Sequence, residues 1–84
     1  MEKKLIGKVS HYYSKAGVAI VELRDELKVG EKISIEGVTT NLQQNVDSMQ
    51  IEHAKIQKAK KGDAIGLKVK DRVRESDHVY KIVQ

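Results

Sequence analysis

The sequence predicts an all-β fold, a small closed six-stranded antiparallel β-barrel, and three observations favour it. Short segments with apolar residues at every second position recur along the 84 residues. Glycine or polar turns separate these segments, and the chain contains six glycines and no proline. Closure would also remove the exposed strand edges through which so small a sheet could aggregate. The length fits a single domain over residues 1–84.

The first half of the chain contains three predicted strands. The alternating segment Lys4–Tyr13 is joined by a turn at Gly17 to Val18–Leu23. The second segment is almost continuously apolar, as expected of a strand that is covered on both sides. A bend at Gly30 then leads into Lys32–Gly37, where two isoleucines alternate with polar residues. This alternation indicates a half-buried strand with a solvent side.

Adjacent aromatic residues end the first predicted strand. Tyr12 and Tyr13 must point to opposite faces, so at most one of them belongs to the core and the other is a candidate for stacking on a base. His11 shares the face of Tyr13, where a core or rim histidine is expected. Tyr12 is therefore the stacking candidate.

The segment between Gln44 and Lys61 supports two interpretations. Apolar spacing by itself favours a helix over Val46–Lys61, because residues at steps of three and four would share one helical face. The alternative is a strand over Gln44–Glu52, with a bulge near Ser48, then a helical turn over Ile56–Lys61 that Gly62 ends. We adopt this alternative, which rests partly on the family resemblance described below.

The last part of the chain has a clearer pattern. Ile65, Leu67 and Val69 alternate with glycine and lysines, which predicts a strand with one buried face. Asp71–Asp77 reads as a charged loop, and His78–Val83 closes the chain with a sixth strand.

Positive charge is concentrated in the second half of the chain. Between His53 and Arg74 there are eight lysines and arginines against two aspartates, a net +6 in a chain whose total is +4, so the rest sums to −2. Such asymmetry attracts polyanions, although a solvated charged face is the plainer explanation. The candidates for RNA contact are Lys55, Lys58, Lys60, Lys61, Lys68, Lys70, Arg72, Arg74 and Tyr12.

Five stretches follow one another in a recognisable order: Gly7–Val9, Leu27–Gly37, Val46–Gln50, Ala59–Leu67 and Asp77–Tyr80. Together they resemble the β-barrel second domain of elongation factor Tu type translational GTPases, and most closely the small free-standing translation elongation factor-like proteins. They also resemble the barrel that ends some collagenase-like peptidase family enzymes implicated in RNA modification. Ser76 departs from the pattern, because a glycine is common at this place in the family.

The resemblance implies a noncatalytic translation-related module that binds RNA or a ribonucleoprotein through a basic face. Its partners would be RNA, tRNA or the ribosome. The alternative is a protein-interaction accessory domain, with a protein partner, that acts in trans with an RNA-modifying collagenase-like peptidase family enzyme. Both hypotheses describe binding rather than catalysis.

The sequence offers no motif for catalysis. It contains no G-x-x-x-x-G-K-[ST] phosphate loop, so no nucleotide triphosphate is expected. The three histidines lack zinc-site spacing, and we nominate no catalytic residue, metal or cofactor. There is no cysteine and no apolar run of about 18 residues, so we expect a cytoplasmic protein that does not contact a membrane.

Overall fold

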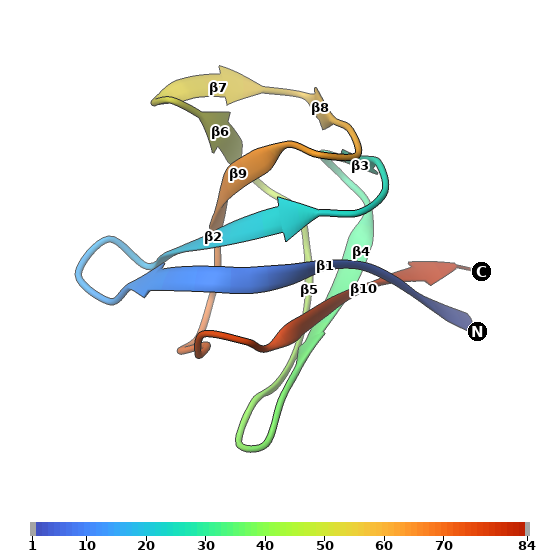
Figure 1. Ribbon diagram of the computed structural model, residues 1–84, viewed down its shortest axis with the longest axis vertical. Coiled ribbons are helices and arrows are strands. Elements are labelled where there is room, and N and C mark those ends of the chain that lie inside the picture. The colour runs from blue at the N-terminus through green and yellow to red at the C-terminus, as the bar shows by residue number, and fades with distance from the viewer. Residues whose placement is uncertain (1, 84) are drawn as a thin grey trace.

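Ten short strands make up the fold, which the computed structural model describes for residues 2–83 (Figure 1). This confirms the all-β prediction. The strands are β1 (Glu2–Tyr13), β2 (Val18–Leu23), β3 (Leu27–Lys28), β4 (Lys32–Glu36), β5 (Asn41–Asn45), β6 (Met49–Ile51), β7 (Ala54–Ile56), β8 (Lys58–Ala59), β9 (Ala64–Lys68) and β10 (His78–Val83). Every pairing between them is antiparallel.

The prediction of a closed six-stranded barrel is wrong. Eight strands form one open sheet in the order β5-β4-β10-β1-β2-β9-β6-β7, and β3 pairs with β8 in a second sheet. Over residues 2–83 no ladder joins the end strands β5 and β7. The sheet curls far enough to bring β5 beside residues 68–74, and we call the line between them the seam.

A side chain, rather than a backbone ladder, bridges the seam. Gln44 is only 5% exposed. Its Nε2 donates to the Lys68 carbonyl at 2.9 Å, and its Oε1 accepts from the Lys70 N–H at 2.8 Å. The glutamine thus supplies the hydrogen bonds that an extra strand would otherwise supply.

Two bulges change which side chains of β1 face the core. The register shifts between Leu5 and Gly7 against β10, and between Val9 and His11 against β2. Each bulge adds a residue and reverses the alternation beyond it. Tyr12 therefore packs against the core, while Tyr13 points outward and is 52% exposed.

Neither interpretation of residues 44–61 is fully correct, because the segment contains no helix. The predicted strand starts earlier as β5, breaks over residues 46–48 and resumes as β6. Residues 56–61, expected as a helical turn, instead include the end of β7 and all of β8. Gly62 does adopt a positive φ of 93°, but in the turn between β8 and β9.

The core lies on the concave side of the curled sheet. The alternation predicted for β9 is confirmed, since Ile65 and Leu67 are fully buried. In β4 the two isoleucines are buried as expected, but Ser34 is buried as well. The Ser34 hydroxyl is satisfied by donating to the Glu36 carboxylate at 2.7 Å.

The charged loop before β10 is confirmed and is tightly anchored. Ser76 donates its N–H to the Val9 carbonyl, and Val9 donates to the Asp77 carbonyl, both at 2.8 Å. The Asp77 carboxylate accepts from the Arg74 N–H at 2.8 Å and lies directly against Gly37, where an added Cβ would come within 1.9 Å of Asp77 Oδ1. Ser76 has a φ of 75°, a conformation that favours the glycine expected there.

Candidate functional site

Two apolar side chains of β2 lie on the outer, convex face of the sheet. Val18 and Ile20 are only half-buried, although their segment was expected to be covered on both sides. Ile20 pairs with His11 on one side and with Gly66 on the other, and Gly66 pairs with Gln50. These pairs place Ile20 in the middle of a row that crosses four strands. Within residues 2–83 nothing packs over this row closely enough to bury it.

A groove of about 640 Å³ follows this row, and we call it the outer groove. It is lined by Tyr13, Ala16, Val18, Ile20, Gln50, Glu52, His53, Ala64 and Gly66. A Cβ added at Gly66 would make near-ordinary contacts, 3.4 Å from Val18 Cγ1 and 3.8 Å from Ile20 Cδ1. The glycine therefore keeps the floor of the groove open.

The two rims of the outer groove are built differently. On one rim the His11 ring stands edge-on to Tyr13, with centroids 4.4 Å apart, and its Nδ1 lies 3.0 Å from a Glu75 carboxylate oxygen. On the other rim Glu52 and His53 form the two-residue turn between β6 and β7, with φ values of 50° and 69°. Two positive φ angles match a type I′ turn, which glycine and asparagine usually occupy. Each such residue costs roughly 1–2 kcal/mol, so the turn is strained at the groove.

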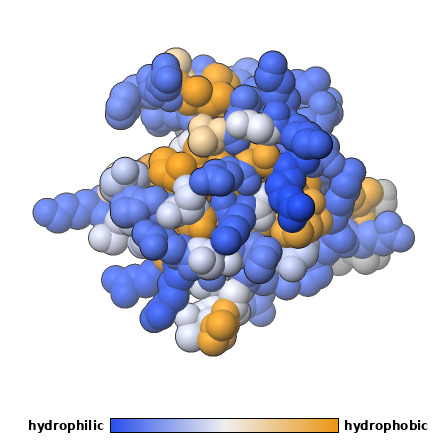
Figure 2. All heavy atoms as spheres, in the orientation of Figure 1, coloured by the Kyte–Doolittle hydropathy of each residue, from blue (hydrophilic) through white to orange (hydrophobic). Residues whose placement is uncertain are grey.

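Hydrophobic atoms reach the surface over β2 and β9, among polar atoms, in the view of Figure 2. A second apolar spot lies at the β4–β5 turn at the bottom of the same view, where Val38 is fully exposed. Val38 is the one aliphatic side chain that lines the pocket beside this turn, whereas Val18 and Ile20 lie together in the outer groove. The outer groove is therefore the better candidate for binding.

The predicted basic residues fall into two groups near opposite ends of the fold (Figure 1). Four lie near β7 and β8, at the top of the view, and three lie in the loop after β9, toward the bottom, with Lys68 in between on the outer face of β9. Lys58 also forms an ion pair with Glu26 at 3.5 Å. The first group is Lys55, Lys58, Lys60 and Lys61, and the second is Lys70, Arg72 and Arg74.

The structure turns the predicted aromatic candidate, Tyr12, toward the core. Tyr12 is half-buried against the core, and its neighbour Tyr13 is the exposed ring.

Val18 and Ile20 were expected to lie in a strand covered on both sides. The signal that could have identified them is their uninterrupted apolar run, because a single curled sheet buries only one face of each strand.

Two ion pairs, Lys4 with Asp25 and Lys3 with Glu36, shift pKa values of their members. The Lys4 ammonium, through a hydrogen bond and its charge, lowers the pKa of the Asp25 carboxyl, and Asp25 in turn raises the pKa of Lys4. Lys3 and Ser34 together lower the pKa of Glu36 by hydrogen bonding to its carboxylate. These three groups lie outside the outer groove.

Residues 2–83 contain neither a cluster of metal-binding side chains nor a membrane-spanning helix. Among residues 2–83, no three histidine, aspartate or glutamate side chains gather in a way that could hold a metal ion. The same residues include no helix long and apolar enough to span a bilayer.

Comparison with known proteins points to proteases and collagenases. The chain is 46% identical over 76 residues to an uncharacterized protease of Methanocaldococcus jannaschii, covering 89% of this chain and 19% of that protein. It is 39% identical over 82 residues to a collagenase of Porphyromonas gingivalis, covering 95% of this chain and 23% of the collagenase. The chain thus spans about a fifth of the length of these curated relatives. No family model matches it.

A solved structure has the same fold. It is the C-terminal domain of a Geobacillus thermoleovorans protein named as a U32 peptidase, with a TM-score of 0.88 and 20% identity over 95% of this chain and 93% of that one. A selenomethionine variant of the same domain gives a TM-score of 0.86 over 90% of this chain.

These matches correct the family expected from the sequence. The relatives are proteases and collagenases rather than elongation factor Tu type GTPases or elongation factor-like proteins, so the translation-factor interpretation is wrong, and these matches give no support to RNA binding. They agree better with the alternative, an accessory domain associated with a collagenase-like peptidase. The chain is thus similar to a short segment of these larger proteins, and it has the fold of a C-terminal domain from a U32 peptidase.

Proposed function

We propose that this domain is a noncatalytic accessory domain that binds the catalytic part of a collagenase-like U32 peptidase through the outer groove. Two kinds of support converge. The relatives are proteins four to five times longer, of which this chain matches one segment. The fold is that of a C-terminal domain in a protein named as a U32 peptidase, so the chain resembles one domain of a larger protein.

The single observation that carries the proposal is the apolar row on the outside of β2. Val18 and Ile20 are half-buried, whereas the outward positions Glu22 on β2 and Lys68 on the neighbouring β9 are charged and exposed. Completing the burial of a half-exposed aliphatic side chain contributes on the order of 1 kcal/mol. A concave apolar surface with polar rims is the usual anatomy of a protein interface core.

Nuclear magnetic resonance tests the proposal directly. The remainder of the M. jannaschii protease, outside its 76 matching residues, is titrated into ¹⁵N-labelled chain after its folding has been checked by circular dichroism. We expect amide shifts along β2, β6 and β9. Ile20→Lys should weaken binding at least tenfold, because it places a charge in the groove.

A matched control tests whether the loss of binding is specific to the outer groove or follows from replacing any exposed apolar side chain with a charge. Val38→Lys makes a similar apolar-to-cationic change at the fully exposed β4–β5 turn and should leave binding unchanged. Shifts confined to that turn, or equal affinity for wild type and the Ile20→Lys variant, would contradict the proposal.

A second candidate function is binding of collagen-type substrate peptides. Tyr13 motivates it, because an exposed aromatic ring braced by His11 at the rim of an apolar groove suits proline-rich chains. Titration with gelatin fragments distinguishes the two. Substrate binding should shift Tyr13 resonances and disappear in a Tyr13→Ala variant, with no peptidase partner present.

A further inference from the structure

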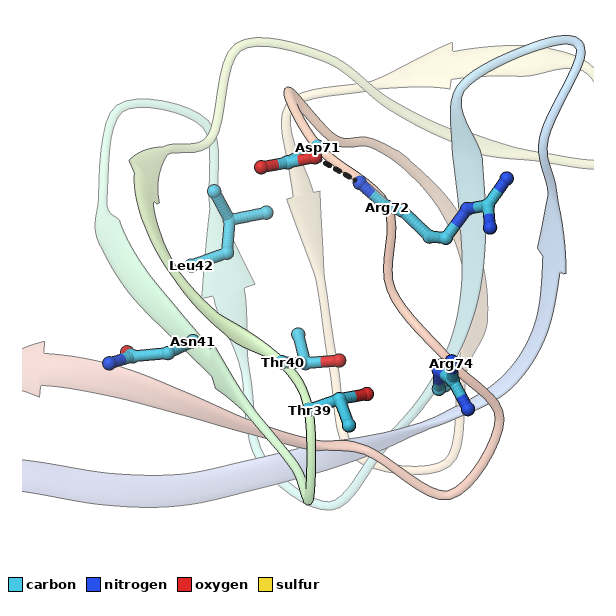
Figure 3. A pocket seen from close by; sticks show the side chains of 7 residues that line it. All are labelled: Thr39, Thr40, Asn41, Leu42, Asp71, Arg72 and Arg74. Carbon is cyan, nitrogen blue, oxygen red and sulfur yellow. Dashed lines mark hydrogen bonds between the residues drawn. The ribbon is translucent and has the colours of Figure 1, made fainter.

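The seam is bridged at one end and open at the other. Gln44 holds β5 to the backbone of residues 68 and 70. Beyond this bridge, toward the start of β5, a pocket of about 410 Å³ separates Thr39–Leu42 from the loop that carries Asp71, Arg72 and Arg74 (Figure 3). The opening is therefore a gap between a sheet edge and a loop.

The edge of β5 at this gap carries unpaired backbone groups. Two bonds bracket the β4–β5 ladder: Gly37 N–H to the Thr40 carbonyl, and Val46 N–H to the Glu31 carbonyl, both within 2.9 Å. Hydrogen-bonded pairs alternate along an antiparallel ladder. Leu42 and Gln44 thus turn their N–H and C=O groups toward β4, while Asn41 and Gln43 turn theirs toward the free edge. Over residues 2–83, β4 is the only strand paired with β5.

The two ends of the gap carry different charged side chains. In Figure 3 the hydroxyls of Thr39 and Thr40 point toward the side of Arg74, Asp71 lies near Leu42, and the Arg72 guanidinium extends away from the threonines. Neither arginine takes part in an ion pair within the described part of the chain. Asp71 accepts from the Arg72 N–H at 2.8 Å. The Arg74 end therefore favours an anion, and the Asp71 end disfavours one.

The loop that presents Arg74 is rigidly held. Val73 is buried in the core, Arg74 N–H is bound by Asp77, and Lys70 N–H is bound by Gln44. An arginine on an anchored backbone loses less freedom on binding than one on a mobile loop. The gap is thus preformed.

We propose that the seam binds an extended acidic peptide segment, which pairs as an added antiparallel strand with the free edge of β5 and places a carboxylate at Arg74. Addition of a strand to an exposed edge is a common mode of peptide recognition. A strand antiparallel to β5 ends at Thr40, beside Arg74, so the acidic residues belong at its C-terminal end. This site shares no residue with the outer groove, so it is independent of the function proposed above.

Synthetic peptides provide the test, with the complete 84-residue chain labelled with ¹⁵N. The probe is acetyl-Ser-Val-Ser-Val-Glu-Glu-amide, and the matched controls are the Gln-Gln analogue and the reversed order acetyl-Glu-Glu-Ser-Val-Ser-Val-amide. We expect shifts at residues 39–43 and at Arg74, with affinity at least fivefold weaker for both controls. Raising the salt concentration should weaken binding of the first peptide, because the ion pair is exposed.

Two variants separate backbone pairing from charge. Arg74→Gln should cost at least fivefold in affinity. Gln43→Pro removes an N–H that faces the free edge, a place where proline is tolerated, and should abolish the shifts along β5. Ile20→Lys should bind as wild type does. Equal binding of the three peptides, no loss on Arg74→Gln, or saturation of the Arg74 shifts by inorganic phosphate without any change along β5 would overturn the proposal. Shift mapping on the wild type decides the matter even if the proline variant does not fold.

Discussion

Replacing Gln44 with methionine is the most informative perturbation of the fold. Methionine matches the length and flexibility of glutamine but makes no comparable hydrogen bonds. The substitution would remove the bonds to the Lys68 carbonyl at 2.9 Å and from the Lys70 N–H at 2.8 Å. It would leave the volume of the core nearly unchanged, so the effect reports on the seam.

The magnitude follows from what the substitution leaves behind. An N–H and a C=O lose their partner, and each loss costs about 1–3 kcal/mol when water cannot replace it. Both belong to exposed residues at the surface end of the seam, so the lower part of the range applies. We expect the free energy of unfolding to fall by about 2–3 kcal/mol. For a domain of this size each kcal/mol lowers Tm by roughly 4–8 °C.

Urea unfolding measures this change, and amide hydrogen exchange locates it. The Lys70 amide should exchange much faster in the variant, whereas amides in the middle of β1 and β2 should keep their order of protection. Gln43→Met is the matched control, because Gln43 is exposed on the opposite face of β5, and it should change stability by less than about 0.5 kcal/mol. A Gln44→Met effect equally small, or an unchanged Lys70 exchange rate, would refute the role given to this side chain.

Three further predictions concern the loop before β10 and the N-terminal ion pair. Gly37→Ala should destabilise the protein by at least about 2 kcal/mol, because the new Cβ would overlap Asp77 Oδ1. In a double-mutant cycle measured by urea unfolding, the Asp77→Ala background should remove most of that destabilisation. Ser76→Gly should stabilise the protein by roughly 0.5–1 kcal/mol by relieving its positive φ, and a lower Tm would show that the serine is not strained. Lys3 lowers the pKa of Glu36, so the ionised Glu36 stabilises the fold above the ordinary carboxyl pKa, and this stabilisation is lost as the pH falls through the lower pKa of the folded state. The Tm of a Glu36→Gln variant should therefore depend less on pH between pH 6 and pH 3. An identical pH profile for the variant and the wild type would contradict this.

The strands that could be predicted are those in which one chemical pattern decides the outcome. In β9 apolar side chains alternate without interruption, so the buried face follows from the sequence. β1 shows the limit of that logic. Its two bulges reverse the alternation, and Tyr12 and Tyr13 exchanged the roles expected of them. A bulge depends on how the partner strands pair, which one strand's pattern does not contain.

The candidate site was harder to predict than the fold. The lysines and arginines were conspicuous in the sequence, but the structure divides most of them between two ends of the molecule. The apolar part of the outer groove is formed mainly by Val18 and Ile20, two aliphatic residues that the sequence pattern assigns to the core. Val18 and Ile20 became candidates only because the single curled sheet leaves their face uncovered.

Short strands with glycine turns could be predicted for this chain, because alternation and turn chemistry act between near neighbours. The open sheet and the glutamine that bridges it follow instead from the three-dimensional arrangement. The Gln44 side chain binds backbone groups 24 and 26 residues further along the chain. Such contacts depend on how the whole sheet curls, which no local pattern records.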